Sequence, residues 1–536
     1  MNTLPFYIAI ISLSLFSNTT SADTVNTRFP EFPHNKDHVF TRMFPQLPPF
    51  APQTPEMRAQ MQELGAIGGL LDAHDNLTDP IQSIINPAVF SPFNPDNPNM
   101  TAGVTFFGQF LDHDITLNKT TPLDEKANPR RTINFRTAAF DLDSVYGEGP
   151  SGSTELYETS SGFIKFITEA IPGSEAVSRH GAMRYDLPRD VNGEAIIGDS
   201  RNDENIIISQ FHLAMLKFHN AVTDQLAAKY DYNHDYSDKV FREARQTVRW
   251  HYQWIILHEF LPTIIGQERL DTILIKGLKH YDINDPENYH LMMDKGGHTL
   301  KTPRIPIEFS VAAYRFGHSQ VRPSYRVNFG PSGGSPFFSF VFDDALDPGN
   351  PDPGDTRGGK RAARRFIDWE TFFNFGDGNF RPNKRIDSKL SSVLMLMPGS
   401  KGPSPGLPSD GVQSLASRNL IRHVNFGLPS GQDVARKLKL PVLTAEQLAD
   451  LAPYHLETST PLWFYILKEA EVMENGLRLG PVGSQIVGEV FVGLLKADKT
   501  AYLNAKPDWK PTLSSDVPGT FRTTDLLKFA GVVPPL

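Results

Sequence analysis

The residues best suited to redox or acid–base chemistry gather in three short runs. The first extends from Gln109 to Asp114; it places His113 between two aspartates, and Gln109 lies one helical turn earlier on the same face. The second run contains Arg201, and the third ends at His318. A histidine changes protonation near neutral pH, and an arginine keeps its positive charge. Together they could supply a general base and a fixed cation that stabilises an anionic substrate.

Composition narrows the chemistry that these runs could perform. The chain has 536 residues and no cysteine, which excludes disulfides, thiolate ligands and iron–sulfur clusters. Any bound metal must therefore use histidine, aspartate, glutamate or backbone oxygen. The net charge of −9 is spread along the chain, and it argues against nucleic acid or an anionic membrane surface as a partner.

In this order, the three runs resemble the distal histidine, distal arginine and proximal histidine of the animal-type haem peroxidases, within the peroxidase–cyclooxygenase superfamily. The resemblance extends over about residues 86–440. It implies a haem b cofactor and hydrogen peroxide as substrate. The second substrate would be a small anionic or aromatic reductant, such as a halide, thiocyanate or a small aromatic donor.

The resemblance assigns the catalytic residues to the first two runs. His113 would take a proton from one peroxide oxygen and deliver it to the other as the bond between them breaks. Arg201 would stabilise the peroxide anion and the leaving oxygen. Gln109 would hold a water molecule or a halide beside them.

Two carboxylates are expected to attach the haem covalently. Asp112 precedes the distal histidine, and Glu204 follows the distal arginine by three positions. In the family, both positions can form esters with haem methyl groups. The family's myeloperoxidase member also forms a sulfonium bond through a methionine directly after that glutamate. Asn205 stands there in this chain, so this third bond is excluded.

The third run supplies the other side of the expected haem site. His318 would be the axial iron ligand, and Gly317 before it would let backbone and haem approach closely. Asn419 matches the family's asparagine that accepts the second N–H of this histidine, and such partners tune the metal. Arg315 and Arg422 occupy positions that can pair with the haem propionates.

Calcium is the second expected cofactor. Oxygen donors alternate along residues 137–143, and calcium takes about 6–8 oxygen ligands. The expected ligands are Thr137, the Ala139 carbonyl, Asp141 and Asp143, completed by Asp114 next to the distal histidine. A calcium ion bound there would fix the orientation of the neighbouring histidine.

Two other functions remain as alternatives. Fatty-acid dioxygenases of the same superfamily carry a radical-forming tyrosine three residues before the proximal histidine. That position is Arg315 here, and Tyr314 is displaced by one residue, or about 100° on a helix. This favours a peroxidase over a dioxygenase. A haem-binding protein with an inactive site is disfavoured because all three site residues are intact.

The remaining histidines considered are expected to be structural. His212 and His219 repeat at seven residues along one helix and match family positions that do not bind iron. His258 begins a sequence similar to a zinc-protease motif, but the second histidine of that motif is missing.

A mainly helical scaffold must position these residues. Both the patterns and the resemblance predict a mainly α protein with little β structure, in which the haem is buried between central helices. Apolar spacing predicts helices over residues 209–229, 241–261, 460–474 and 482–495, and loops over 347–359 and 398–411. Thr460 is the expected N-cap of the third helix, with Pro461 at its first position.

The N-terminus has the features of an export signal. An apolar run over residues 6–16 is too short to span a bilayer comfortably, and small residues precede a cleavage position near Ala22. We expect a signal peptide over residues 1–22, an extended arm over 23–60 and a haem peroxidase domain over 61–536. The protein would then be secreted or periplasmic, with no membrane span.

Overall fold

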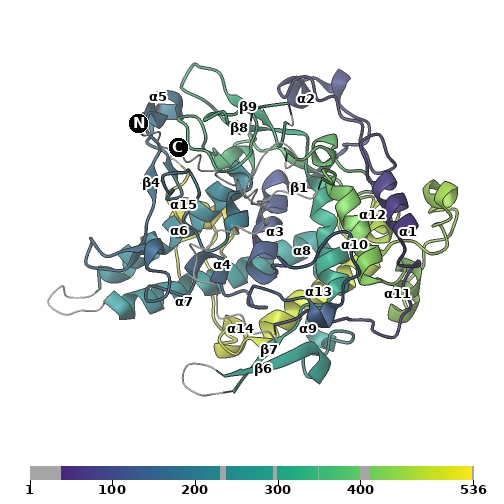
Figure 1. Cartoon of the computed structure of the whole chain (residues 1–536). Coiled ribbons are helices and arrows are strands. Elements are labelled where there is room, and N and C mark those ends of the chain that lie inside the picture. The colour runs from purple at the N-terminus through teal and green to yellow at the C-terminus, as the bar shows by residue number, and fades with distance from the viewer. Residues whose placement is uncertain are drawn as a thin grey trace, which may run out of the picture.

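The computed structural model describes residues 38–229, 237–293, 299–343, 345–347, 349–398 and 411–533. The expected signal peptide and most of the expected loop 398–411 lie outside these ranges. Helices dominate the described part, as predicted, and they surround a central helix, α3 (Figure 1). The helices are α1 (Pro55–Leu64), α2 (Gln82–Ile85), α3 (Ala102–Ile115), α4 (Asp143–Tyr146), α5 (Ser174–Val177), α6 (Ile206–Ala227), α7 (Ser237–Ile255), α8 (Leu261–Ile265), α9 (Gln267–Lys276), α10 (Leu415–Phe426), α11 (Gly431–Leu438), α12 (Leu462–Glu474), α13 (Pro481–Ala497), α14 (Tyr502–Ala505) and α15 (Thr523–Phe529).

The β structure of the described residues consists of small antiparallel pairs. These pairs are β1 (Asp96–Thr101) with β10 (Pro382–Lys384), β2 (Tyr157–Glu158) with β3 (Lys165–Phe166), β4 (Glu169–Ala170) with β5 (Tyr185–Asp186), β6 (Tyr289–Met293) with β7 (Thr299–Pro303), and β8 (Ser324–Asn328) with β9 (Phe337–Phe340). The expected fold class, mainly α with little β, is therefore confirmed.

Helix α3 is buried on most of its surface and carries the first of the three runs. Phe106, Phe107, Phe110 and Leu111 lie in the hydrophobic core. The helix packs against α6, and the Phe107 and Phe110 rings both contact Phe211 of that helix. This packing leaves the last turn of α3 as the part of the helix that faces polar neighbours.

Helix α6 begins three residues before the predicted start at residue 209. Asn205 caps it, because its Oδ1 accepts hydrogen bonds from the Ile207 and Ile208 N–H groups at 3.1 and 3.0 Å. The cap fixes the start of α6 directly after the loop that carries Arg201 and Glu204.

The predicted helix over residues 241–261 is longer in the structure. It begins at Ser237 and continues through a π-helical turn, η6 (Ile256–Phe260), into α8, so it does not end before Pro262. Proline lacks an N–H and cannot make the α-helical bond to the carbonyl four residues earlier. The wider π turn lets the helix pass this position.

The predicted start of the helix over residues 460–474 is also shifted. Pro461 is the N-cap and α12 begins at Leu462, so Thr460 does not cap the helix. The Thr460 hydroxyl instead donates to the Leu456 carbonyl at 2.7 Å. The last of the four predicted helices corresponds to α13.

The described part of the expected arm is tied to the segment that precedes His318. Thr41 exchanges backbone hydrogen bonds with Ile305 and Ile307, each 3.0 Å long. The Met43 and Phe44 N–H groups donate to the buried carboxylate of Glu308 at 2.9 and 3.2 Å. The end of this arm differs from the prediction of an extended segment, because residues 55–60 belong to α1.

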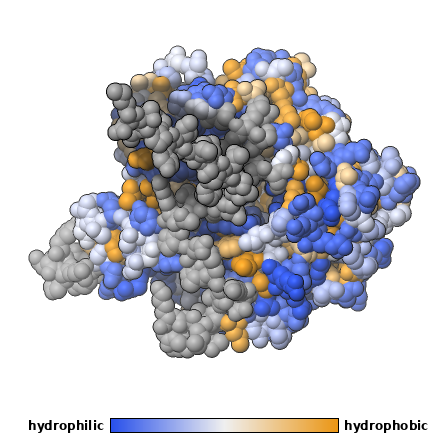
Figure 2. All heavy atoms as spheres, viewed as in Figure 1, coloured by the Kyte–Doolittle hydropathy of each residue, from blue (hydrophilic) through white to orange (hydrophobic). Residues whose placement is uncertain are grey.

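Polar residues predominate on the face shown in Figure 2, where apolar residues form separate patches. Among the described helices, none combines the length and the apolar composition required to cross a membrane.

Candidate functional site

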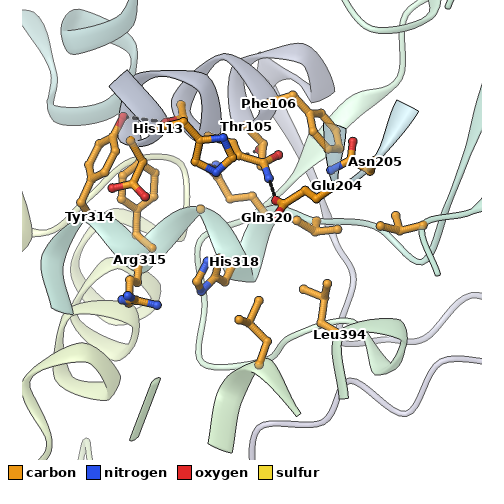
Figure 3. Close-up of a pocket in the computed structure, with 18 of the residues that line it drawn as sticks. Thr105, Phe106, His113, Glu204, Asn205, Tyr314, Arg315, His318, Gln320 and Leu394 are labelled. Carbon is orange, nitrogen blue, oxygen red and sulfur yellow. Dashed lines mark hydrogen bonds between the residues drawn. The ribbon is translucent and has the colours of Figure 1, made fainter. Parts of the chain in front are cut away.

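The three runs meet at one cavity. It has a volume of about 500 Å³ and lies between α3, which lines it from Val104 to His113, and the 3₁₀ helix η9 (Ala313–Gln320). Figure 3 shows His113 and His318 on opposite sides of this space. The sequence-predicted residues on its wall are Gln109, Asp112, His113, Arg201, Glu204, Arg315, His318 and Arg422.

His113 is held in one tautomer by Asn202. The Nδ1 atom lies 2.8 Å from the Asn202 Oδ1, and the Asn202 amide nitrogen lies 3.0 Å from the Nδ1 of His212. Because an amide oxygen only accepts, the His113 Nδ1 carries the proton and Nε2 keeps a free lone pair. Burial, together with the positive charge of Arg201, lowers the pKa of His113 to about 3, so the ring is neutral at neutral pH.

Arg201 closes the C-terminal end of α3. Its Nη2 donates to the carbonyls of His113 and Thr116 at 3.1 and 2.7 Å. Its Nε and Nη2 also donate to the two oxygens of Asp199 at 3.1 and 2.8 Å. Burial alone would raise the pKa of Asp199, but Arg201 and Arg136 hold it well below its usual value. The guanidinium therefore faces the cavity with a carboxylate behind it.

The two carboxyl groups expected to bind haem both face the cavity. Burial raises the pKa of Glu204 to about 8, although Arg201 opposes the shift. Burial also raises the pKa of Asp112, and the Thr116 hydroxyl donates to its Oδ1 at 2.9 Å. Gln109 does not stand alone in the cavity, because its amide nitrogen donates to Glu204.

His318 meets Asn419 as predicted, but the amide is turned the other way. The Asn419 nitrogen lies 2.7 Å from the His318 Nδ1, and the Asn419 oxygen accepts from the Arg315 Nη1 at 2.7 Å. In this orientation the His318 Nδ1 accepts, and the imidazole proton lies on Nε2. A neutral ligand that binds iron through Nε2 needs its proton on Nδ1, so the amide must turn and Arg315 must release the oxygen.

Tyr314 lines the cavity despite its displaced position in the sequence. Its hydroxyl donates to the Gly108 carbonyl of α3 at 3.0 Å, and its ring stacks on Phe309 with centroids 4.9 Å apart. The tyrosine thus joins the two walls of the cavity. Tyr314 therefore still reaches the cavity, although it stands one residue before the position at which the fatty-acid dioxygenases carry their tyrosine.

The cavity wall fits a haem in three respects. Arg315, Arg418 and Arg422 place cationic groups on the His318 side, where they could hold propionates. The rest of the wall includes apolar side chains suited to a macrocycle, namely Val104, Phe106, Phe260, Phe316, Val321, Leu394 and Met397. A Cβ atom built on Gly317 would meet nothing within 4 Å, so no packing contact fills the space beside this glycine.

A second group of acidic residues lies directly behind His113. One carboxylate oxygen from each of Asp114, Asp141 and Asp143 falls within 4.8 Å of the others. Burial and mutual repulsion raise the pKa of Asp114 well above its usual value and that of Asp141 to about 7. A divalent cation would offset this repulsion. Thr137 is also present, with its hydroxyl 3.1 Å from Asp143, whereas the Ala139 carbonyl as a ligand stays a prediction.

Further residues that hold Asp114 were not identified from the sequence. The Ser144 hydroxyl donates to one oxygen at 3.0 Å, and the Tyr252 hydroxyl donates to the other at 3.1 Å. Leu142, whose N–H also donates to Asp114 at 3.3 Å, has a left-handed backbone with φ of 62°. Asn202 was missed as well. It lies next to Arg201, and its position directly beside a catalytic candidate is the only signal that the sequence offers.

The histidines expected to be structural have other partners. His212 contacts Asn202, and the Nδ1 of His219 lies 3.0 Å from the Tyr146 hydroxyl. The Nε2 of His258 lies 3.1 Å from the Tyr502 hydroxyl. The acidic group behind His113 is the only cluster of three metal-ligating side chains found among the described residues.

Comparisons with known proteins agree with this geometry. Residues 117–336 match the family model for animal haem peroxidase. Human thyroid peroxidase is 26% identical over 217 residues, which cover 37% of this chain and 21% of the relative. A peroxidasin homologue from Caenorhabditis briggsae is 24% identical over 410 residues, which cover 72% of this chain and 28% of the relative. The matches thus span less than a third of these longer proteins.

Two solved structures share the fold. Peroxidase A from Dictyostelium discoideum superposes with a TM-score of 0.55 at 18% identity, over 91% of this chain and 92% of the other. A fatty acid alpha-dioxygenase from Oryza sativa gives a TM-score of 0.51 at 13% identity, over 92% and 86% of the two chains. The fold is therefore common to a peroxidase and a dioxygenase, and the choice between them depends on the site.

Calcium should stabilise this protein through the acidic cluster. At a calcium concentration about 100 times the dissociation constant, we expect the free energy of unfolding to rise by ~2.7 kcal/mol. Asp141→Asn should remove most of this gain, because one of the three carboxylates is lost. The matched control is Asp508→Asn, an exposed position outside the cluster. Denaturant unfolding with calcium and with a chelator measures the effect, and an undiminished gain in Asp141→Asn would contradict the site.

Proposed function

We propose that this chain, whose residues 117–336 match the family model for animal haem peroxidase, is a peroxidase that reduces hydrogen peroxide and oxidises small anionic or aromatic donors. The observation that supports this most is the pairing of His113 and His318 across one cavity, with Arg201 beside His113. When bound, haem supplies the iron that exchanges electrons with peroxide and donor.

The role proposed for His113 follows from its tautomer. Its Nε2 has a free lone pair because Asn202 holds the proton on Nδ1. Nε2 accepts a proton from hydrogen peroxide and returns it to the oxygen that leaves as water. The low pKa keeps the ring neutral before peroxide arrives, so the ring does not first have to lose a proton.

The charge of Arg201 complements this proton transfer. The guanidinium favours the anionic form of peroxide and the developing charge on the leaving oxygen. Asp199 and the carbonyls of His113 and Thr116 hold the guanidinium in place, so it needs little reorganisation during the reaction.

We propose that His318 would ligate the haem iron and that Arg315 and Arg422 would hold the haem propionates. A propionate near Arg315 would compete with the Asn419 oxygen for its Nη1. The released amide could then turn its oxygen toward the His318 Nδ1, which is the arrangement that a neutral ligand requires.

The ester links are proposed on the state of the two carboxyl groups. Burial disfavours the charged forms of Asp112 and Glu204, and an ester is neutral. Asn205 is occupied as the N-cap of α6, and its side chain cannot supply a sulfonium bond. We therefore propose oxidation of iodide, bromide or thiocyanate, with poor oxidation of chloride, which demands the highest potential.

A fatty-acid dioxygenase is the second candidate, because Tyr314 lines the cavity. Its hydroxyl donates to a backbone carbonyl, which cannot take the proton that the tyrosine must lose when it is oxidised to a neutral radical. Oxygen uptake with a fatty acid, measured beside peroxide turnover with iodide, separates the two activities.

Export is proposed from the sequence alone. The apolar run over residues 6–16 and the small residues before Ala22 support a secreted or periplasmic enzyme.

Two alanine variants should separate the roles of the two histidines. His113→Ala should keep haem but react with peroxide ~10²–10⁴ times more slowly, because the general base is lost. His318→Ala should lose haem or its axial ligation. The control is His74→Ala, an exposed histidine away from the cavity. Stopped-flow absorption and haem content per chain give the answer, and normal peroxide reactivity in His113→Ala would refute the assignment.

The ester links predict haem that resists acid–acetone extraction after several turnovers with peroxide. The double variant Asp112→Ala, Glu204→Gln should release its haem freely, because no cavity carboxyl group is left at either position. The control Glu446→Gln changes an exposed carboxylate and should retain the haem. Mass spectrometry of a digest identifies the linked peptides, and free extraction from the unaltered protein would exclude the esters.

A further inference from the structure

A cluster of oxidisable aromatic residues lies at the surface near the C-terminal segment. Three of the five tryptophans of the chain contribute to it. Trp509 contacts Trp250, Trp254 and Tyr502 with ring centroids 5.5, 6.0 and 5.4 Å apart. Trp254 stacks on the ring of His258, an exposed residue, with centroids 3.7 Å apart.

Tyr502 belongs to the cluster, and its hydroxyl proton has a possible acceptor in His258. The Tyr502 hydroxyl lies 3.1 Å from the His258 Nε2, and Tyr502 is only 2% exposed. Oxidation of a tyrosine to a neutral radical removes one electron and one proton, so a base must receive that proton. Partial burial, together with the positive charge of Lys510, lowers the pKa of His258 to about 4, so the ring is neutral at neutral pH.

Other described tyrosines lack this combination. The hydroxyls of Tyr314, Tyr281 and Tyr157 donate to backbone carbonyls, which cannot take a proton. Tyr146 also has a histidine partner, His219, but both rings are fully buried. Among the tyrosines that the structure describes, Tyr502 is the one whose hydroxyl lies beside a histidine that is itself exposed to solvent.

The cluster is connected to the cavity through one continuous helix. Trp254 and His258 precede Phe260, which lines the cavity and lies 6.5 Å from the Tyr314 ring. Phe260 lies six positions after Trp254 in this helix, at the end of the π-helical turn η6. The Tyr502 N–H also donates to Gln253 of this helix at 3.2 Å.

Local charge favours Tyr502 over Trp254 as the oxidised residue. The Lys510 Nζ lies 5.2 Å from the Trp254 ring centre, and a nearby cation disfavours a tryptophan radical cation. Tyr502 becomes a neutral radical because His258 takes its proton. Trp250 is half-buried, so its ring, together with the His258–Trp254 stack, offers donors a contact at the surface.

We propose that this cluster is a second oxidation site, at which phenolic donors too large for the cavity are oxidised by one electron; the inference rests on the proposed peroxidase function. Tyr502 gives an electron to the peroxide-oxidised site and its proton to the His258 Nε2. A donor phenol then returns an electron through the surface rings, His258 returns the proton to Tyr502, and the donor proton goes to water. Two donors consume one hydrogen peroxide: 2 ArOH + H₂O₂ → 2 ArO• + 2 H₂O.

The test compares two donors on the haem-loaded full-length protein. Iodide enters the cavity, whereas tyramine coupled to dextran does not. Tyr502→Phe should lower kcat/KM for tyramine-dextran by about tenfold or more and leave iodide oxidation unchanged. His258→Gln should have a similar effect, because glutamine can accept the hydrogen bond but not the proton. Tyr146→Phe, at the buried tyrosine–histidine pair, is the matched control.

A spectroscopic measurement gives a second readout. Rapid-freeze electron paramagnetic resonance after peroxide addition should show a tyrosyl radical that narrows when the protein contains ring-deuterated tyrosine. The signal should disappear in Tyr502→Phe and persist in Tyr146→Phe. Three results would each overturn the inference. The radical signal could be absent, the unaltered protein could fail to oxidise tyramine-dextran, or Tyr502→Phe could oxidise tyramine-dextran as fast as the unaltered protein does. Loss of iodide oxidation in the unaltered protein would instead refute the proposed peroxidase function.

Discussion

The last turn of α3 is held from three directions, and the rest of the site depends on this restraint. Arg201 binds its terminal carbonyls, Asn202 fixes the His113 ring, and Ser144 and Tyr252 bind Asp114. A helix end otherwise leaves several carbonyls without partners and frays readily. Here each of these neighbours either belongs to the site or contacts a residue of the site or of the acidic cluster, so the contacts that hold the helix end also orient the groups that do the chemistry.

The two cavity histidines differ in the amide atom that each one meets. His113 faces the oxygen of Asn202, because the nitrogen of that amide is directed to His212. His318 faces the nitrogen of Asn419, because the oxygen of that amide is directed to Arg315. One ring is thereby prepared to accept a proton at Nε2. To bind iron through Nε2, the His318 ring would first have to exchange the Asn419 nitrogen for the Asn419 oxygen, which now accepts a hydrogen bond from Arg315.

The sequence predicted the helical class and the residues that meet in the cavity, because short motifs fix those residues relative to one another. It did not predict Asn202, whose role depends on a contact 89 residues away in the chain. Nor did it predict the orientation of Asn419, which Arg315 determines. The helix that passes Pro262 shows the same limit, since a π turn leaves no clear pattern in the sequence. Local patterns identify the residues, whereas tertiary hydrogen bonds decide what each can donate or accept.

We propose that His318 binds the haem iron while His113 remains a free base. The spin state of the ferric haem-loaded protein tests this directly by electron paramagnetic resonance. We expect a high-spin signal, with His318 as the single histidine ligand and the Asn202 contact holding His113 away from the iron. A low-spin signal typical of two histidine ligands, lost in His113→Ala, would contradict it.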